Sequence, residues 1–178
     1  MSVWDDEYGI SVHARHQTTK ENISEILKGY QRDEKNNGYE IFRVKGWDYA
    51  ELIATYEKAA ALAREEHVPV LIHVQQLTQP QGHSTSGSHE RYKNSERLAW
   101  EKEYDCLRQM RLWMIAINIA SPEELDVIDA EAKKEVLEAK KEAWNNFIQP
   151  IINEQKELIT LLEQLAPSSI NKDFITKH

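Results

Sequence analysis

Cysteine is nearly absent from this chain, which has a single one, Cys106. A lone cysteine cannot form an internal disulfide, so the fold must be stabilised in another way. The residues around it, EYDCLRQM, have the spacing of an amphipathic helix. We therefore interpret Cys106 as a core-packing residue rather than a nucleophile.

Long apolar runs and an excess of positive charge are also missing. No apolar stretch approaches the roughly 20 residues needed to span a bilayer, and the start, MSVWDDEY, lacks the basic and apolar regions of a signal peptide. The 30 acidic residues outnumber the 22 Lys and Arg residues, for a formal net charge of −8, and both signs alternate along the predicted helices. A phosphate-backbone binder concentrates Lys and Arg on one face. These absences predict a soluble, cytoplasmic protein without a membrane or nucleic-acid partner.

The sequence does contain the strand–helix–strand pattern of an α/β domain. β-favouring residues predict a strand over 39–44, and Asp48 followed by Glu51 is the capping box that opens a helix. The run HVPVLIHVQQL is almost entirely β-branched and aliphatic, which is typical of a parallel strand covered on both faces. A separate amphipathic helix is expected over 19–33. The order predicts a βαβ unit in one domain, because 178 residues leave little room for two.

A loop rich in Gly, Ser, His and Pro follows the second strand, and its sequence is TQPQGHSTSGSHERYKNSE. Ligands in open α/β sheets bind beyond the carboxyl ends of the strands, so this loop is the expected ligand site. We assign residues 1–93 to a partial α/β region with an active-site loop at 78–93. Residues 94–178 form the expected helical extension.

The extension is predicted to be helical from Arg97 onward. Ser121 and Pro122 open a long helix, since serine caps well and proline suits the first helical position. Pro150 is expected to bend or end that helix, with a last helix running to about residue 165. Trp100 and the aromatic residues that follow it are expected to serve helix packing or contact with a partner subunit.

Three stretches together resemble one protein family. WDDEYGISV is similar to the motif NNxYxIS that closes the thiamine-diphosphate signature of 2-oxo acid dehydrogenases, and GYEIFRVKGWD is similar to their Arg-Val-x-Gly-x-Asp segment. GHSTSGSHERY resembles the alpha-subunit loop that covers the active-site mouth. Order and spacing agree over residues 3–115. The chain thus resembles the alpha-type part of such a dehydrogenase, closest to the branched-chain, 2-oxoisovalerate type, including bacterial forms with fused alpha and beta halves.

The resemblance implies a fold and an activity. The fold would be α/β, the C-terminal part of a thiamine-diphosphate-binding fold with a partial parallel sheet flanked by helices, followed by the helical extension. The activity would be oxidative decarboxylation of a 2-oxo acid and acyl transfer to lipoamide, with thiamine diphosphate and Mg²⁺. The partners would be a beta-type, transketolase-like half and a lipoyl-bearing acyltransferase component.

Two parts of the family's active site are not in this sequence. One is the Gly-Asp-Gly half of the cofactor signature, and the other is the activating glutamate, which the family carries on the beta half. The chain therefore resembles a fragment, and alone it is expected to be inactive.

The first stretch would hold the metal and the cofactor. By resemblance, the side chain of Asp6 and the backbone carbonyl of Tyr8 would bind Mg²⁺, which prefers hard oxygen ligands. Gly9, Ile10 and Ser11 would line the cofactor. The family usually has asparagine where this chain has Asp6, so an additional negative charge lies beside the expected diphosphate site.

The loop would supply the catalytic group. His83 matches the histidine beside the reaction centre, where a side chain that titrates near neutral pH suits proton transfer, and it would also contact the cofactor. Ser84 and Tyr92 match a regulatory serine and a loop tyrosine. The match at Ser84 is positional and does not by itself predict phosphorylation. Lys93 stands where the family has arginine, and Gly87 replaces an acidic residue.

Simpler readings stay open for these residues. The acidic run from Asp5 to Glu7 could be a solvated turn. A zinc cluster of His13, His16, His83 and His89 is conceivable, but the spacing fits no structural-site signature. His67 and His73 lie at or in the apolar strand and are interpreted as structural.

Two other functions remain open. The chain could be a non-catalytic interaction module that associates with itself, which would make it a homo-oligomer. It could also be a switch that a kinase regulates at Ser84.

Overall fold

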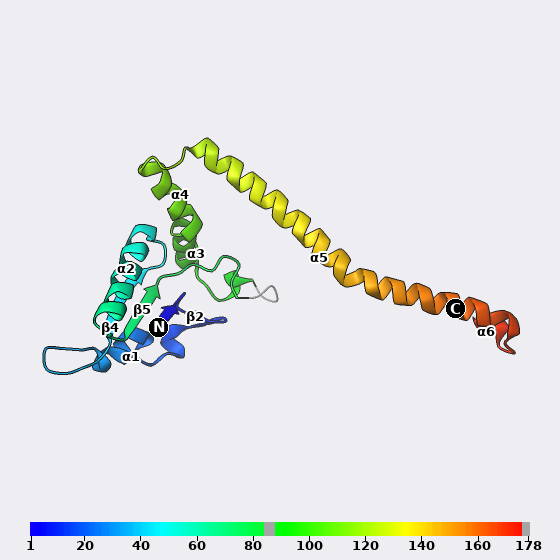
Figure 1. Cartoon of the computed structure of the whole chain (residues 1–178), viewed down its shortest axis with the longest axis horizontal. Coiled ribbons are helices and arrows are strands. Elements are labelled where there is room, and N and C mark those ends of the chain that lie inside the picture. The colour runs from blue at the N-terminus through cyan, green and yellow to red at the C-terminus, as the bar shows by residue number, and fades with distance from the viewer. Residues whose placement is uncertain (84–87, 176–178) are drawn as a thin grey trace. The chain divides into compact units, whose positions relative to one another are not determined.

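A small parallel sheet organises the first part of the molecule. The computed structural model describes residues 1–83 and 88–175. Strands β1 (Ser2–Trp4), β4 (Glu40–Lys45) and β5 (Val70–Gln75) lie in the order β1-β5-β4, and both pairings are parallel (Figure 1). Helix α2 (Tyr49–Glu65) joins β4 to β5. The fold is thus α/β with a parallel sheet flanked by helices, and the predicted βαβ unit is present.

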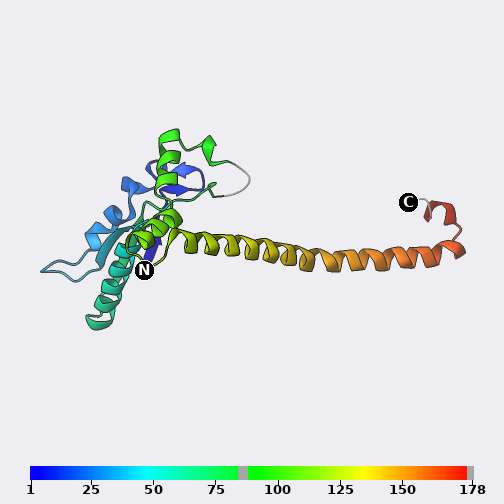
Figure 2. The same cartoon turned by 90° about the horizontal axis from the view of Figure 1, so that it is seen from above.

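Strand β5 is the centre of the sheet and contacts helices on both faces. Ile72 and Val74 pack with Val44 and Ala59 in the buried core beneath α2, which lies along the sheet (Figure 2). His73 points to the opposite face, because side chains alternate along a strand, and there it meets helix α1. Burial on both faces explains why the β5 sequence is continuously apolar apart from this histidine.

The turn between β4 and α2 is defined by a cap and by a close approach. Asp48 caps α2 through a hydrogen bond from the Glu51 backbone N–H to its carboxylate, at 3.0 Å. Gly46 donates its N–H to the Gln75 carbonyl at 2.8 Å, and a Cβ at this glycine would collide with the Leu77 side chain. Glycine at this position lets the chain pass close to the Leu77 side chain at the end of β5.

Short elements fill the region where one helix was predicted over 19–33. They are β2 (Tyr8–Gly9), β3 (Val12–His13), the 3₁₀ turns η1 (Ala14–His16), η2 (Thr19–Glu21) and η3 (Lys28–Tyr30), and α1 (Ile23–Leu27). The prediction of a single helix over 19–33 was wrong. Lys20 and Glu21 adopt positive φ angles, 56° and 59°, and Asn22 then caps α1, so the backbone cannot continue as one helix.

Two helices follow the loop where the sequence indicated continuous helix. They are α3 (Ser95–Glu103) and α4 (Cys106–Ala116), preceded by the turn η4 (His89–Arg91). Asp105 caps α4 by accepting a hydrogen bond from the Arg108 N–H at 2.9 Å. Tyr104 packs on Trp47 with ring centroids 4.7 Å apart. The expected aromatic packing is present, and it joins α3 to the α/β region.

The chain divides into two compact units, Met1–Ser121 and Pro122–His178. Within the first unit, aromatic side chains at the end of α3 and in α4 pack on the α/β region. Helix α5 (Pro122–Leu165) begins at the predicted proline, and η5 (Ala166–Ser168) and α6 (Lys172–Ile175) follow it.

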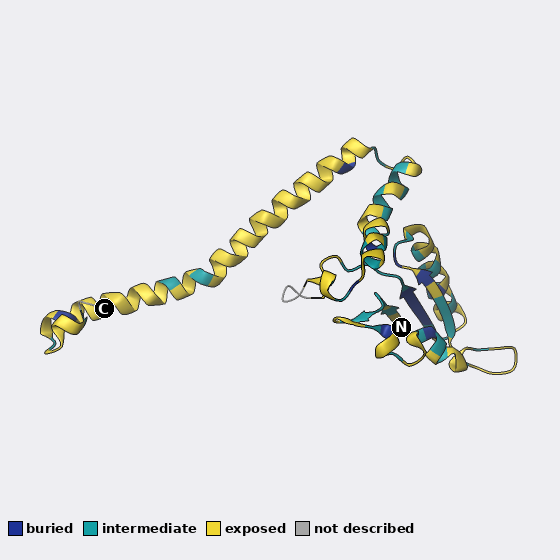
Figure 3. Ribbon diagram, turned by 180° about the vertical axis from the view of Figure 1, so that it is seen from behind, coloured by how far each residue is buried: buried dark blue, intermediate teal, exposed yellow. Residues whose placement is uncertain are grey.

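Helix α5 runs through Pro150 instead of ending there. Most of its surface is exposed, whereas strands β4 and β5 contain buried residues (Figure 3). Among the described residues, no helix combines the length and the apolar character required to cross a bilayer.

Candidate functional site

The two segments predicted to carry the chemistry leave the sheet side by side. The first follows β1 and the second follows β5, and these strands are parallel neighbours with Trp4 opposite Val74. The Asp5 N–H donates to the Val74 carbonyl at 2.9 Å, and the Leu77 N–H donates to the Asp5 carbonyl at 3.1 Å. The WDDEYGISV segment and the loop over residues 78–93, called the histidine loop below, therefore start at the carboxyl ends of two neighbouring strands, where ligands bind in open α/β folds.

The three consecutive acidic residues of the first segment have different partners. Asp5 accepts a hydrogen bond from Nε2 of His73 at 2.9 Å, and Nδ1 of His73 faces the hydroxyl of Ser24. His73 and Ser24 are fully buried. The bond from His73 is the main reason why the pKa of the Asp5 carboxyl is lowered, against the opposing effect of burial. Asp5 therefore belongs to a buried structural array, as expected for His73.

Glu7 forms an ion pair with a residue ninety positions away. Nη1 of Arg97 donates to the Glu7 carboxylate, and Nη2 of the same guanidinium donates to the Asp6 backbone carbonyl at 3.0 Å. The Glu7 carbonyl accepts the Ala14 N–H at 2.8 Å. Glu7 has a positive φ of 67°, an uncommon conformation that these contacts hold in place.

Asp6 is left with the least engaged carboxylate of the three. Among the described residues, its only hydrogen bond comes from the Tyr8 backbone N–H to Oδ1, at 3.1 Å. The Ala14-to-Glu7 bond makes Tyr8 and His13 a non-hydrogen-bonded pair of the β2–β3 ladder, so the Tyr8 carbonyl is not used by that ladder. One carboxylate and one carbonyl are hard oxygen donors of the kind Mg²⁺ accepts.

These donors fit part of a magnesium site. Mg²⁺ is usually held by one or two protein oxygens together with phosphates and water, which matches a site completed by a diphosphate. Within the described ranges, no group of three or more His, Cys, Asp or Glu side chains could hold a metal by itself. The donor set therefore suits a shared metal and not a self-contained protein cage.

The three predicted cofactor-lining residues form the tip of the hairpin. Gly9 is the last residue of β2, and Ile10 and Ser11 make the turn to β3. Ile10 has a positive φ of 60° and is 63% exposed, and Ser11 is also exposed.

Tyr8 lies in a cluster of rings and cations. Its ring is 5.8 Å from Tyr92 and 5.1 Å from His13, and Lys93 and Arg97 lie over it at 5.1 and 5.4 Å. Burial raises the pKa of the Tyr8 phenol, which stays neutral at physiological pH. A cation over the face of an aromatic ring is attracted electrostatically by the ring quadrupole. The cluster therefore ties the segment around Tyr8 to Tyr92 and Lys93 at the end of the loop.

The loop histidine is connected to the same cluster through its neighbour. Gly82 has φ of 80°, and a Cβ there would collide with the Tyr92 hydroxyl. His83 follows this glycine and is exposed. The structure thus brings Tyr8 and the residue before His83 into contact with one tyrosine. Ser84 lies outside the described residues.

The base of the loop is held by a buried ion pair that sequence reasoning missed. Nζ of Lys93 donates to both oxygens of Glu101, at 2.7 and 3.0 Å, and the two side chains are 1% and 6% exposed. Nε of Arg97 donates to the same carboxylate at 2.9 Å. Burial alone would lower the pKa of Arg97, but its bonds to Glu101 and Glu7 raise it overall. The spacing of four residues from Arg97 to Glu101 could have predicted their ion pair on one face of a helix.

The remaining histidines have separate surroundings. Nδ1 of His13 accepts the Arg15 N–H at 3.2 Å, His16 accepts from the Arg15 side chain at 3.0 Å, and His89 pairs with Glu90 at 3.3 Å. The described part of the chain offers no metal cluster that would join them.

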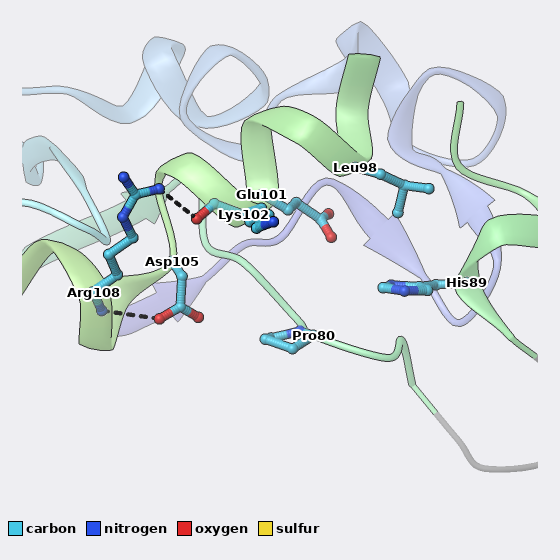
Figure 4. Close-up of a pocket in the computed structure, with 7 residues that line it drawn as sticks. All are labelled: Pro80, His89, Leu98, Glu101, Lys102, Asp105 and Arg108. Carbon is cyan, nitrogen blue, oxygen red and sulfur yellow. Dashed lines mark hydrogen bonds between the residues drawn. The ribbon is translucent and has the colours of Figure 1, made fainter. Parts of the chain in front are cut away.

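A cavity of about 370 Å³ lies between the loop and the helices that follow it (Figure 4). Its lining includes Pro80 and His89 from the loop side and Leu98, Glu101 and Arg108 from α3 and α4. Glu101 links the cavity to the ion-pair network described above. The sequence held no signal for this cavity, because loop and helix meet only in the folded chain.

Known proteins provide an independent comparison. Residues 2–152 match the model of a family described as Dehydrogenase E1 component. The chain is 26% identical over 133 residues to a protein named pyruvate dehydrogenase E1 component subunit alpha, from Rickettsia bellii (strain RML369-C). The alignment covers 75% of this chain and 39% of the Rickettsia protein. The chain therefore spans less than half the length of this relative.

Proposed function

Because this chain belongs to the dehydrogenase E1 component family, we propose that it supplies one wall of the active site of a thiamine-diphosphate-dependent 2-oxo acid dehydrogenase. The observation that carries the proposal is the meeting of the two signature segments at the ends of β1 and β5. The complete enzyme would decarboxylate a 2-oxo acid oxidatively and transfer the acyl group to lipoamide. A branched-chain 2-oxo acid is the proposed substrate.

The residues of the first segment would bind the cofactor's metal. Asp6 would supply a carboxylate oxygen and Tyr8 its backbone carbonyl, while the turn at Gly9 to Ser11 would lie against the cofactor. The low engagement of Asp6 supports this role, because Asp5 and Glu7 already have partners. When bound, thiamine diphosphate supplies the carbanion chemistry of decarboxylation.

His83 would move a proton at the mouth of the site. His83 is exposed, and an imidazole has one ring nitrogen that can accept a proton and one that can donate it during acyl transfer. Gly82, the residue before His83, lies against the Tyr92 hydroxyl. The proposed partners are a beta-type half, which would bring the activating glutamate, and a lipoyl-bearing acyltransferase component.

Calorimetry with thiamine diphosphate and Mg²⁺ tests the proposal. The chain alone is expected to bind very weakly, and a longer protein with the Gly-Asp-Gly segment and the beta half is expected to bind and to release CO₂ from 2-oxoisovalerate. Tight binding by the chain alone would contradict its incompleteness. Absence of binding and decarboxylation in the complete assembly would contradict the function.

A pair of histidine variants tests the role of His83 in that assembly. His83→Asn removes the imidazole proposed to transfer the proton, and a loss of activity of about 100-fold or more with unchanged cofactor binding is expected. His67→Asn is the matched control, because His67 precedes β5 and lies at the opposite end of that strand. Equal activity of both variants would remove His83 from the mechanism.

A non-catalytic module that associates with itself is the second candidate. The exposed apolar side chains of α5, among them Trp144 at 58% and Phe147 at 64%, favour it. Sedimentation of the chain would then show a concentration-dependent dimer that Trp144→Glu abolishes. A monomer at all concentrations, together with an active complete assembly, would exclude this candidate.

A further inference from the structure

Arg97 contacts two consecutive residues of the proposed metal-binding segment, Asp6 and Glu7. From α3, its guanidinium donates to the Asp6 carbonyl, to the Glu7 carboxylate and to the Glu101 carboxylate. We infer that Arg97 is a positioning residue, which holds Asp6 and Tyr8 in the arrangement that binds the cofactor's metal. This inference rests on the proposed function.

The shape of the guanidinium suits this role. Arginine presents donors in a planar, rigid fork, so one side chain can bind acceptors that lie in different directions. Nη2 reaches the carbonyl of Asp6, and Nη1 reaches the side chain of the next residue. These two hydrogen bonds constrain the Asp6 carbonyl and the Glu7 side chain. They therefore restrict the backbone torsion angles around Asp6.

Arg97 also determines which carboxylate remains available to a cation. The Asp5 carboxylate binds His73, and the Glu7 carboxylate binds Arg97. The Asp6 carboxylate accepts a hydrogen bond only from the nearby Tyr8 N–H among the described residues. Without Arg97, Glu7 would add an unpaired negative charge next to Asp6. Two like charges at adjacent positions disfavour each other and would compete for the metal.

The position of Arg97 is itself fixed from behind. Its side chain is 16% exposed, and it stacks over Trp100 with 4.6 Å from the guanidinium carbon to the ring centroid. The Glu101 carboxylate accepts a hydrogen bond from Nε of Arg97 and two hydrogen bonds from Nζ of Lys93. The Lys93–Glu101 pair at the base of the histidine loop is therefore continuous with the segment that holds Asp6. Lys93 provides an ordering contact of its own where the family has arginine.

The test measures metal binding in the assembled enzyme that contains this chain. Binding of Mn²⁺, an EPR-visible stand-in for Mg²⁺, is measured in the presence of thiamine diphosphate, together with kcat at saturating Mn²⁺. Arg97→Ala is expected to raise the Kd for Mn²⁺ about tenfold or more, as loss of a residue that orients metal ligands does. The kcat at saturating metal is expected to fall far less than the affinity.

Two further variants separate positioning from general destabilisation. Arg108→Ala is the matched control, because Arg108 also donates to a carbonyl, that of Lys102, and to a carboxylate, that of Glu103, on the adjacent helix. It is expected to leave the Kd for Mn²⁺ unchanged. Arg97→Lys keeps the charge but not the fork, so it should keep the unfolding midpoint of the chain and still weaken Mn²⁺ binding.

A second readout needs no cofactor. In the chain by itself, hydrogen exchange of the amides from Glu7 to Gly9 is expected to accelerate in Arg97→Ala and Arg97→Lys, while exchange in β5 stays slow. Folded Arg97 variants that bind Mn²⁺ like the wild type would overturn the inference and leave the proposed function intact. A wild-type assembly that binds neither Mn²⁺ nor thiamine diphosphate would overturn the proposed function and the inference with it.

Discussion

The unit Met1–Ser121 and helix α5 use the same kinds of side chain in opposite ways. Leu71 in β5 is 1% exposed and lies among neighbours on the sheet, whereas Leu137 in α5 is 65% exposed. Charged residues differ in the same manner. Lys93 and Glu101 are buried partners in the first unit, while the lysines and glutamates of α5 are exposed to solvent.

The comparison shows where tertiary packing stabilises this protein. In the first unit, strands that are distant in sequence bury a common core and hold the candidate site at their ends. In α5, stability comes from backbone hydrogen bonds and helix propensity, which depend on neighbours in sequence. Substitutions should therefore be costly in the first unit and mild in α5. Four experiments test this difference.

Breaking the buried ion pair should have the largest effect. Glu101→Ala leaves Lys93 charged and buried without its partner, so the free energy of unfolding should fall by about 3–5 kcal/mol. Glu103→Ala removes an exposed partner of Arg108 and should cost less than about 1 kcal/mol. Urea unfolding followed by circular dichroism measures both. Equal losses would mean that burial does not distinguish the two glutamates.

Matched leucine deletions compare the two regions directly. Leu71→Ala removes a fully buried side chain and should lower the free energy of unfolding by about 2–5 kcal/mol. Leu137→Ala should change it by less than about 0.5 kcal/mol, because alanine is the better helix former and little surface is uncovered. A large loss of unfolding free energy for Leu137→Ala in the purified chain would show that another copy of the chain covers α5 in solution.

The proline within α5 provides a change of opposite sign. Pro150 lacks a backbone N–H and is placed inside the helix, so Pro150→Ala should stabilise α5 locally by up to about 3 kcal/mol. Helical ellipticity should then persist to higher temperature. The near-UV spectrum of the first unit should not change, and a shift there would show that the two units are coupled.

The smallest effect expected is a change in pH dependence. The pKa of Asp5 is lowered in the folded chain, chiefly by the bond from His73, so its carboxylate stabilises the fold above its ordinary pKa near 4. That contribution is lost as the pH falls from about 4 through the folded pKa. The unfolding free energy of Asp5→Asn should therefore fall less steeply below pH 4 than that of the wild type. Parallel pH profiles would exclude this contribution.

Several features of the fold could be predicted because their causes are local. The apolar run of β5, the Asp48 cap of α2 and the start of α5 at Pro122 each depend on a few adjacent residues. The break between α3 and α4 was missed, although Asp105 is a good cap, because the apolar stripe continues across it. The hairpin formed by Tyr8 to His13 was also missed, since positive φ angles at Glu7 and Ile10 are unusual for these residues.

The sequence by itself determined the family, the α/β class and the identity of the two segments proposed to carry the chemistry. Only the tertiary structure decided which partners the carboxylates of Asp5, Asp6 and Glu7 have, and how Lys93 at the base of the histidine loop is held. The reason is that these properties depend on His73 and Arg97, which are 68 and 90 residues away from their partners. Contacts over such separations form only when strands and helices from distant parts of the chain pack together, and no local sequence pattern encodes them.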